Sequence, residues 1–207
     1  MLEELKQFVR DNTIGRDPSH GYEHMEKVYN NAMKIAAIEG NLTRDSMNCI
    51  ITVAWLHDVA DRKYDKDGEL RKRVSEFLVV FMPHCAVELL QCIDAISFST
   101  EKRNGKEYYN SYLLPKYLKI RNIVSDADKL EALGVVGIER CLQYIRHLSK
   151  EKGEELSKKE EMENVLEHCD EKLFILSNEY MRTESGKEMA YNLETEMKIW
   201  LLQNQKN

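Results

Sequence analysis

Turn-forming residues are scarce in this sequence, and this scarcity limits the folds that are open to it. Only 3 Pro and 9 Gly occur among 207 residues, whereas a sandwich or barrel of many short strands needs frequent turns. Apolar residues make up 43% of the chain, which is enough for a buried core and unlike a disordered chain. A protein built mainly of helices is therefore expected.

Apolar residues recur at helical spacing along most of the chain. Residues 22–40 repeat them at steps of three and four and end at Gly40. The next segment starts at a predicted N-cap, Thr43, and is so continuously apolar between Ile50 and Leu56 that we expect it to lie mostly inside the domain. A charged loop at 65–68 is followed by a predicted helix that ends at about residue 82. Further helices are predicted over 84–98, over 120–134 with a continuation to 148, and over 158–181 and 184–203.

Residues 99–110 form the longest polar stretch, and Asn104-Gly105 provides a turn within it. We expect a mobile loop there. Its tyrosines could stack on a base or simply pack against the domain, and both alternatives stay open. No internal repeat and no linker composition interrupts the chain, so a single compact domain is expected.

Charge and cysteine usage exclude several classes of partner. The chain has 30 basic and 36 acidic side chains and a net charge of −6, which offers no overall footprint for nucleic acid or anionic lipid. No apolar run approaches a membrane span, and no basic and apolar leader is visible. The five cysteines are widely spaced without a CxxC pair and are interpreted as reduced thiols. A cytoplasmic protein without nucleic-acid or membrane partners is expected.

Three short segments place imidazoles and carboxylates beside buried apolar residues. They are Ser19-His20-Gly21-Tyr22-Glu23-His24, His57-Asp58 and Asp126-Ala127-Asp128. Taken singly, each such His or Asp is more often a cap, an ion-pair member or a satisfied core group. Burial of an ionised carboxylate nevertheless requires a partner, a cation or a metal. Together, the three segments point to a divalent-metal site built from separate helices.

The stretches SHGYEHMEKV, LHDVADRKYD, AISFS, SDADKLEALGVVGIER and TESGKEMA occur in this order between about residue 15 and residue 200. In them the chain resembles the HD-domain metal-dependent phosphohydrolase superfamily, and within it a branch of small stand-alone bacterial-type hydrolases. The resemblance implies an all-α HD-domain helical bundle in a single domain over residues 1–207. The motif-bearing core would span about 15–150, with C-terminal helices at about 158–204 packed on it.

The resemblance implies that one divalent ion is held by His24, His57, Asp58 and Asp128. Asp126 and Asp128 point roughly 200° apart around a helix, so both cannot face one ion. The family pattern favours Asp128 as the ligand and leaves Asp126 to orient a ligand. Manganese, iron, cobalt, nickel, zinc and magnesium all stay open as the ion.

The resemblance also suggests residues for the chemistry. Asp61 lies four residues after His57, where related hydrolases carry an acid that handles protons near the attacking water. The alternative is an ordinary loop acid. Lys63 and Lys129 are the cations nearest the motifs and could neutralise a phosphoryl group, although most such charges are only solvated surface. For His20, capping and contact with a ligand or the substrate are about equally expected.

Two positions test how far the resemblance holds. Lys27 stands where the family most often has Arg, which keeps the charge but loses the bidentate fork. His84 lies outside the motifs, and a dinuclear site would need it to reach the ion. The resemblance implies a phosphohydrolase that uses a metal-activated water to cleave a phosphate ester or anhydride, with a nucleotide as the favoured small-molecule substrate. A non-catalytic nucleotide-binding or regulatory module and a dinuclear-iron oxygenase are the alternatives, and a homodimer stays open.

Overall fold

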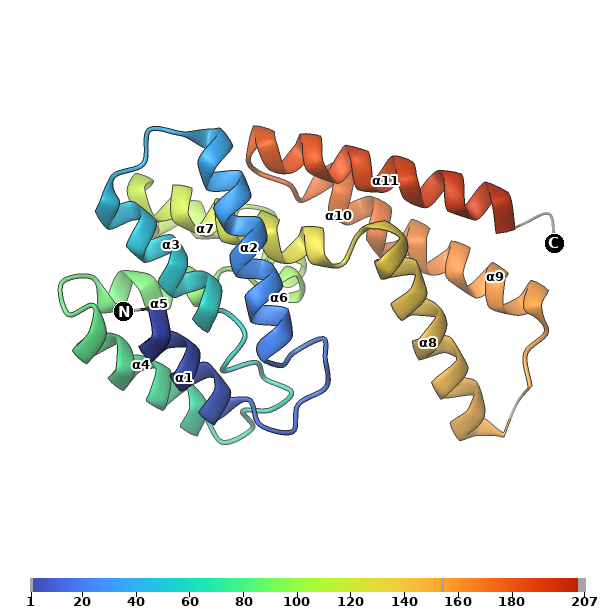
Figure 1. The fold of residues 1–207 in the computed structure, drawn as a ribbon, viewed down its shortest axis with the longest axis horizontal. Coiled ribbons are helices and arrows are strands. Elements are labelled where there is room, and N and C mark those ends of the chain that lie inside the picture. Colours follow the sequence, from blue (N-terminus) through green and yellow to red (C-terminus); the bar gives the residue numbers. More distant parts are fainter. Residues whose placement is uncertain (1, 154, 205–207) are drawn as a thin grey trace. The chain divides into compact units, whose positions relative to one another are not determined.

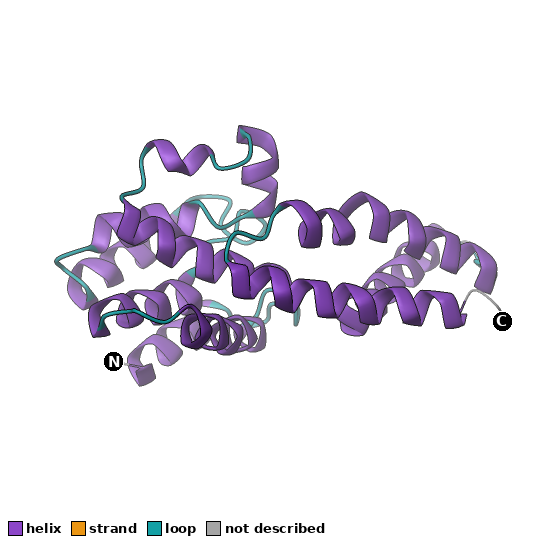
Figure 2. Ribbon diagram, turned by 90° about the horizontal axis from the view of Figure 1, so that it is seen from above, coloured by secondary structure: helices purple, strands orange, loops and turns teal. Residues whose placement is uncertain are grey.

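A computed structural model describes residues 2–153 and 155–204. Every regular element in those residues is helical and none is a strand, which confirms the prediction of an all-α protein (Figures 1 and 2). No helix in the described part of the chain is long and apolar enough to cross a membrane. The chain divides into two compact units, Met1–Ala127 and Asp128–Asn207.

The first unit is a group of helices around one largely buried helix, α3 (Arg44–Leu56). Its elements are α1 (Leu2–Asn12), α2 (Tyr22–Glu39), α3 (Arg44–Leu56), α4 (Glu69–Phe81), α5 (Ala86–Asp94), α6 (Phe98–Asn104), the 3-10 turn η1 (Tyr108–Ser111) and the start of α7 (Pro115–Glu131). Helix α3 packs against α1, α2 and α5. Its last five residues, which end with Trp55 and Leu56, are all fully buried at 0% exposure. The expectation that this segment lies inside is confirmed.

Local signals define the ends of α2 and α3. Gly40 ends α2 with a φ of 58°, a left-handed value that glycine adopts without strain. The Thr43 side chain accepts a hydrogen bond from the Ser46 N–H at 3.1 Å and caps α3, as predicted. Helix α3 ends at Leu56, and His57 is its C-cap. The chain then continues through tight turns up to residue 65.

The prediction of a mobile loop over 99–110 is wrong. Most of that stretch is helix α6 and the turn η1. The side chains of Glu101 and Arg121 are both 0% exposed and form an ion pair at 3.0 Å. Tyr109 is also buried and donates a hydrogen bond to Glu101 at 3.2 Å. A polar sequence is therefore folded here around a buried charge pair. The predicted helix over 84–98 is also shorter, because α5 covers only Ala86–Asp94.

The second unit consists of α8 (Gly134–Lys152), α9 (Lys158–His168), the π-helical turn η2 (Cys169–Leu173), α10 (Phe174–Glu179) and α11 (Glu184–Asn204). Helix α8 packs against α9 and α11. The predicted helix over 158–181 is thus present, with one π-helical turn inside it. Ser157 and Glu160 form a capping box at its start. All five cysteines of the chain are free and buried, in agreement with the prediction of reduced thiols.

Candidate metal centre

Two histidines meet where α2 begins and α3 ends. His24 lies in the first turn of α2 and is 6% exposed, whereas His57 is the half-buried C-cap of α3. Their Nε2 atoms are 3.2 Å apart, and their rings are tilted by 57°. Two residues separated by 33 positions in the sequence therefore direct the same ring atom at a common point.

The hydrogen bond of the other ring nitrogen fixes the tautomer of His57. Its Nδ1 lies 2.8 Å from the carbonyl oxygen of Ala54. A carbonyl can only accept, so Nδ1 carries the proton and donates it. In the neutral ring Nε2 then carries its lone pair, and this atom faces Nε2 of His24. This arrangement, in which one ring nitrogen donates to a carbonyl and the other faces outward, is typical of metal-binding histidines.

Asp128 completes a group of three side chains. It is carried by α7, which runs without interruption from Pro115 to Glu131. One ligand atom from each of His24, His57 and Asp128 lies within 4.8 Å of the other two. Among the described residues, this is the one such group of His, Cys, Asp or Glu.

The spacing of the two imidazoles fits a divalent ion. Two ligand atoms, each about 2.1 Å from an ion at tetrahedral or octahedral angles, are separated by about 3.0–3.4 Å. The observed separation of the two Nε2 atoms is 3.2 Å. Two imidazoles and a carboxylate are also a donor set that borderline divalent ions accept. The residues present therefore fit a metal ion, whose identity the donor set leaves open.

Asp58, Asp126 and Lys129 are sequence neighbours of His57 and Asp128 but do not belong to the group of three. Asp58 is half-buried and follows His57 directly, but it is not part of the group of three. Asp126 and Lys129 are almost completely buried, at 0% and 2% exposure. The group of three contains Asp128 and not Asp126, while the roles of Asp58, Asp126 and Asp128 as ligands stay predictions.

Asp61 and Lys63 lie in the turns that follow His57. One carboxylate oxygen of Asp61 accepts the backbone N–H of Lys63 at 2.7 Å. The Lys63 ammonium is 59% exposed and is paired with Asp17 at 3.0 Å. The hydrogen bond to Asp17 raises the pKa of Lys63, so the side chain stays charged. Its charge is shared with a carboxylate, which weakens it as a cation for a phosphoryl group.

Asp17 is a residue that sequence reasoning missed. Its carboxylate accepts hydrogen bonds from the Ser19 N–H and hydroxyl, Lys63 and the Tyr64 hydroxyl, and it contacts Nδ1 of His20 at 3.1 Å. Burial alone would raise the pKa of Asp17, but these hydrogen bonds hold it well below its usual range. The only signal in the sequence was its place two residues before Ser19-His20.

Arg16 is a second missed residue. Its guanidinium donates to the backbone carbonyls of Asp58 at 3.0 Å and Val59 at 2.6 Å, and also to that of Asn12. It lies over the ring of Tyr64, 4.4 Å from the centroid. Burial lowers the pKa of Arg16, while the nearby carboxylates of Asp58 and Asp61 favour its charged form. No periodicity or motif marked this residue.

The remaining histidines have other surroundings. His20 contacts Asp17 and the Ser19 hydroxyl through Nδ1, at 3.1 and 2.9 Å. His84 is exposed and pairs with Asp45 at 3.3 Å, and it is not part of the metal-binding group. The structure therefore gives no support to a dinuclear site that includes His84.

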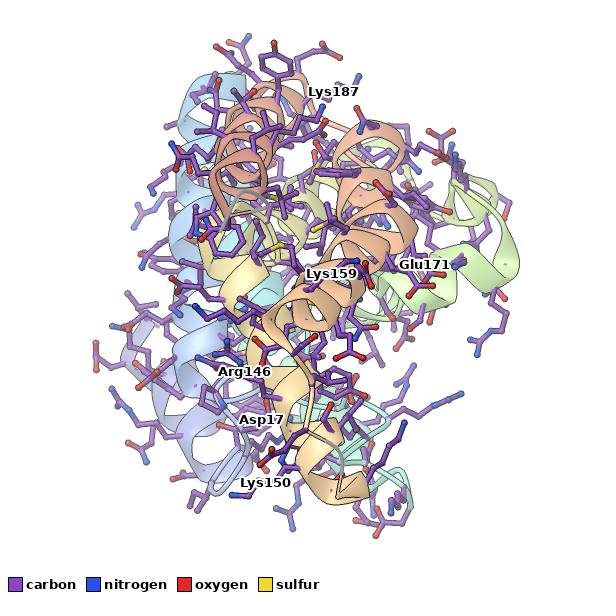
Figure 3. The ribbon with its side chains drawn as sticks, turned by 90° about the vertical axis from the view of Figure 1, so that its right-hand side faces the viewer. Asp17, Arg146, Lys150, Lys159, Glu171 and Lys187 are labelled. Atoms are coloured by element: carbon purple, nitrogen blue, oxygen red, sulfur yellow. The ribbon has the colours of Figure 1, made fainter. Side chains whose placement is uncertain are left out.

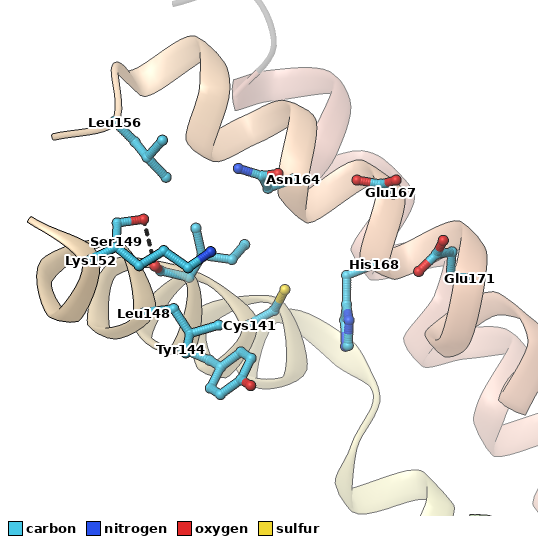
Figure 4. A pocket seen from close by; sticks show the side chains of 11 residues that line it. Cys141, Tyr144, Leu148, Ser149, Lys152, Leu156, Asn164, Glu167, His168 and Glu171 are labelled. Carbon is cyan, nitrogen blue, oxygen red and sulfur yellow. Dashed lines mark hydrogen bonds between the residues drawn. The ribbon is translucent and has the colours of Figure 1, made fainter. Parts of the chain in front are cut away.

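A separate cleft lies in the second unit, between α8 and the end of α9 (Figure 4). It has a volume of about 360 Å³, and its lining includes Lys152, Asn164, His168 and Glu171. Burial lowers the pKa of His168, and the positive charge of Lys172 lowers it further. None of the predicted site residues lines this cleft.

Comparison of the sequence with known proteins gives a distant relative. No protein-family model matches it. It is 24% identical over 155 residues to an uncharacterized protein, L803, of Acanthamoeba polyphaga mimivirus; the match covers 70% of this chain and 59% of the viral protein. The chain thus spans about three fifths of the length of that relative.

Solved structures match over nearly the whole chain. Bacillus subtilis YpgQ, in a crystal structure with ADP, has 22% identity and a TM-score of 0.68, covering 99% of this chain and 93% of YpgQ. An HD-superfamily hydrolase from Bacillus thuringiensis has 24% identity and a TM-score of 0.62, covering 99% of this chain and 95% of the hydrolase. Identities this low establish the fold alone. This chain therefore has the fold of the small HD-superfamily hydrolases, as the sequence resemblance implies.

Proposed function

We propose that the protein is a divalent-metal-dependent phosphohydrolase with His24, His57, Asp58 and Asp128 as metal ligands. The observation that carries this proposal is the pair of Nε2 atoms 3.2 Å apart. The proton on Nδ1 of His57 is directed to Ala54, so Nε2 is available to a metal. The carboxylate of Asp128 stands beside both rings. The fold shared with HD-superfamily hydrolases supports the same reaction class.

The chain's own side chains then have distinct tasks. The chemistry that a divalent ion supplies in such a site is a lowered pKa of its bound water and polarisation of a phosphoryl oxygen. Asp61 uses one oxygen for the Lys63 N–H, which fixes the carboxylate and leaves the second oxygen to hold a proton. Lys129, which is 2% exposed, contributes a buried positive charge. Lys63 is the more exposed cation and shares its charge with Asp17.

The proposed substrate is a nucleotide, cleaved at a phosphate ester or anhydride. The proposal is supported by the crystal structure of YpgQ, which has the same fold, in complex with ADP. A panel of nucleoside mono-, di- and triphosphates and a generic phosphodiester, assayed with manganese, iron, cobalt, nickel, zinc and magnesium, identifies the substrate and the ion together.

The variant His57→Ala tests the ligand assignment. Because the ring contributes only one hydrogen bond to the C-terminal end of α3, from Nδ1 to the carbonyl of Ala54, the variant should keep most of its helix content while losing both bound metal and hydrolysis. His147→Ala is the matched control, since His147 is 67% exposed on α8 and only pairs with Glu151. Metal content is measured after purification without chelator, beside the hydrolysis assay.

Each result has a distinct meaning. About one ion per wild-type chain with metal-dependent hydrolysis, both lost in His57→Ala, supports the proposal. Normal metal content in His57→Ala would refute the ligand assignment. Metal binding without hydrolysis of any substrate in the panel would favour a non-catalytic binding module, and two irons per chain would favour an oxygenase.

A further inference from the structure

Two loops carry the histidines of the metal centre, and they lie far apart in the sequence. Residues 13–21 lead into α2, whose first turn holds His24. Residues 57–68 follow α3, beginning with His57 itself. Neither loop contains a long helix, so the position of each depends on side-chain contacts. The separation of the two imidazoles is therefore sensitive to how these loops are joined.

Arg16 joins the first loop to the main chain of the second. Its planar guanidinium donates to the carbonyls of Asp58 and Val59, the two residues directly after His57. A third hydrogen bond, to the carbonyl of Asn12 at the end of α1, holds the guanidinium in place. The flat face lies over Tyr64, which belongs to the second loop as well. One side chain thus fixes the turn in which His57 sits.

Asp17 joins the same loops through side chains. It binds Lys63 and Tyr64 of the second loop, 46 and 47 residues away in the sequence. It also binds Ser19 within its own loop. Its carboxylate is 38% exposed, so these contacts lie at the rim of the first unit. Adjacent residues of opposite charge therefore hold the two loops by separate sets of hydrogen bonds.

We propose that Arg16 and Asp17 are a positioning pair that holds the His24 and His57 loops at the spacing a divalent ion requires. Metal ligands need to be held to within about 0.5 Å of the productive geometry, and the residues that bind the ligands' supports provide this. The inference rests on the proposed metal site and extends it. It says that the affinity of the site for a divalent ion depends on two residues that are not themselves among the proposed ligands.

The first test is Arg16→Lys. Lysine keeps the charge, but its single ammonium cannot reproduce the planar fork that reaches two successive carbonyls and stacks on Tyr64. Loss of such supporting contacts typically weakens metal binding by about 10- to 100-fold. Cobalt titrated into metal-free protein reports both the affinity, by calorimetry, and the coordination geometry, by visible absorption. We expect weaker binding and shifted absorption bands.

Arg146→Lys is the matched control. Arg146 lies on α8 of the second unit (Figure 3). It also makes a two-pronged contact, with Glu161 at 2.7 Å, and its side chain is 59% exposed. Its replacement should leave cobalt binding unchanged. Amide hydrogen exchange of residues 57–65 in the metal-free protein adds a measurement that needs no ion. Exchange there should become faster in Arg16→Lys and not in Arg146→Lys.

Asp17→Asn and Tyr64→Phe keep the test decisive if Arg16→Lys does not fold. Asparagine keeps the shape and loses the charge that holds Lys63, and phenylalanine removes one hydrogen bond to Asp17. We expect weaker cobalt binding in both, with a smaller effect in Tyr64→Phe, and restoration of part of the affinity in Asp17→Glu.

The outcomes separate this inference from the proposed function. Cobalt affinity and spectra that match the wild type in both Arg16→Lys and Asp17→Asn would overturn the positioning role and leave the metal site intact. Wild-type protein that binds no cobalt would overturn the metal site itself. Weaker binding with unchanged exchange at residues 57–65 would also overturn the role, because it would show that the loops do not depend on the pair.

Discussion

Glu101→Gln is expected to destabilise the protein strongly, although the residue lies in a polar stretch. Glu101 and Arg121 form a pair whose side chains are both 0% exposed. The guanidinium also donates to the carbonyl of Ala95 at 2.9 Å and lies 3.7 Å from the ring centre of Tyr109. These contacts fix Arg121 where water cannot replace a lost carboxylate.

The magnitude follows from that burial. Removal of one partner of a buried ion pair leaves the other charge uncompensated and costs about 3–5 kcal/mol. The free energy of unfolding of a typical domain is only about 5–15 kcal/mol. Glutamine has almost the same size as glutamate and keeps one acceptor oxygen for Tyr109, so the loss reports the missing charge rather than a cavity.

Urea unfolding followed by circular dichroism measures the effect. The control is Glu163→Gln, because Glu163 is 63% exposed and pairs with Lys159 at 3.7 Å. An exposed pair of this kind is worth at most about 1 kcal/mol. The double variant Glu101→Leu with Arg121→Met should recover most of the stability, since it leaves no buried charge. A free energy of unfolding of Glu101→Gln within about 0.5 kcal/mol of the wild type would refute the reasoning.

Two further predictions concern the proposed reaction and the buried thiols. Asp61→Asn should lower turnover about 10²- to 10⁴-fold while bound metal stays at the wild-type level; unchanged turnover in steady-state kinetics would show that Asp61 only caps the Lys63 N–H. Burial raises the pKa of Cys49, Cys92 and Cys169 to about 12 each, whereas a thiol in the unfolded chain has a pKa near 8.5. The folded state therefore favours the protonated thiols, and their contribution to the free energy of unfolding is complete below about pH 8.5 and is lost as the pH rises toward 12. The free energy of unfolding should fall above pH 9 by up to about 1.4 kcal/mol per pH unit for each thiol, and equal urea midpoints at pH 8 and pH 10 would contradict this.

The helices were predictable where the burial of one face leaves a regular trace in the sequence. Helices α2 and α3 agree with the expected residues because their apolar residues face the core of the first unit and their ends carry Gly40 and Thr43. Helix α6 was not predictable in this way. Its sequence, FSTEKRN, is polar, and the partner of Glu101 lies 20 residues away. Spacing arguments detect apolar faces and cannot detect a charge that is buried against a distant charge.

The same limit applies to the candidate site. His24, His57 and Asp128 stand in motifs that a reader of the sequence can find, and the structure brings their ligand atoms together. Arg16 carries no local signal and Asp17 only its place before Ser19-His20, since their contacts with the second loop lie 42 to 47 residues away. The groups that could bind an ion are therefore visible in the sequence, whereas the groups proposed to hold them in position become visible only in three dimensions.

The place where α3 ends determines how the imidazole of His57 is oriented. The last carbonyls of a helix have no partner within the helix. Leu56 gives its carbonyl to the Val59 N–H, and the carbonyl of Ala54 accepts Nδ1–H of His57. In the interior of a helix the carbonyl of Ala54 would already accept a backbone N–H, and the imidazole proton would have no fixed acceptor there. The helix end thus satisfies its own carbonyl and, by the same hydrogen bond, directs the lone pair of Nε2 toward His24.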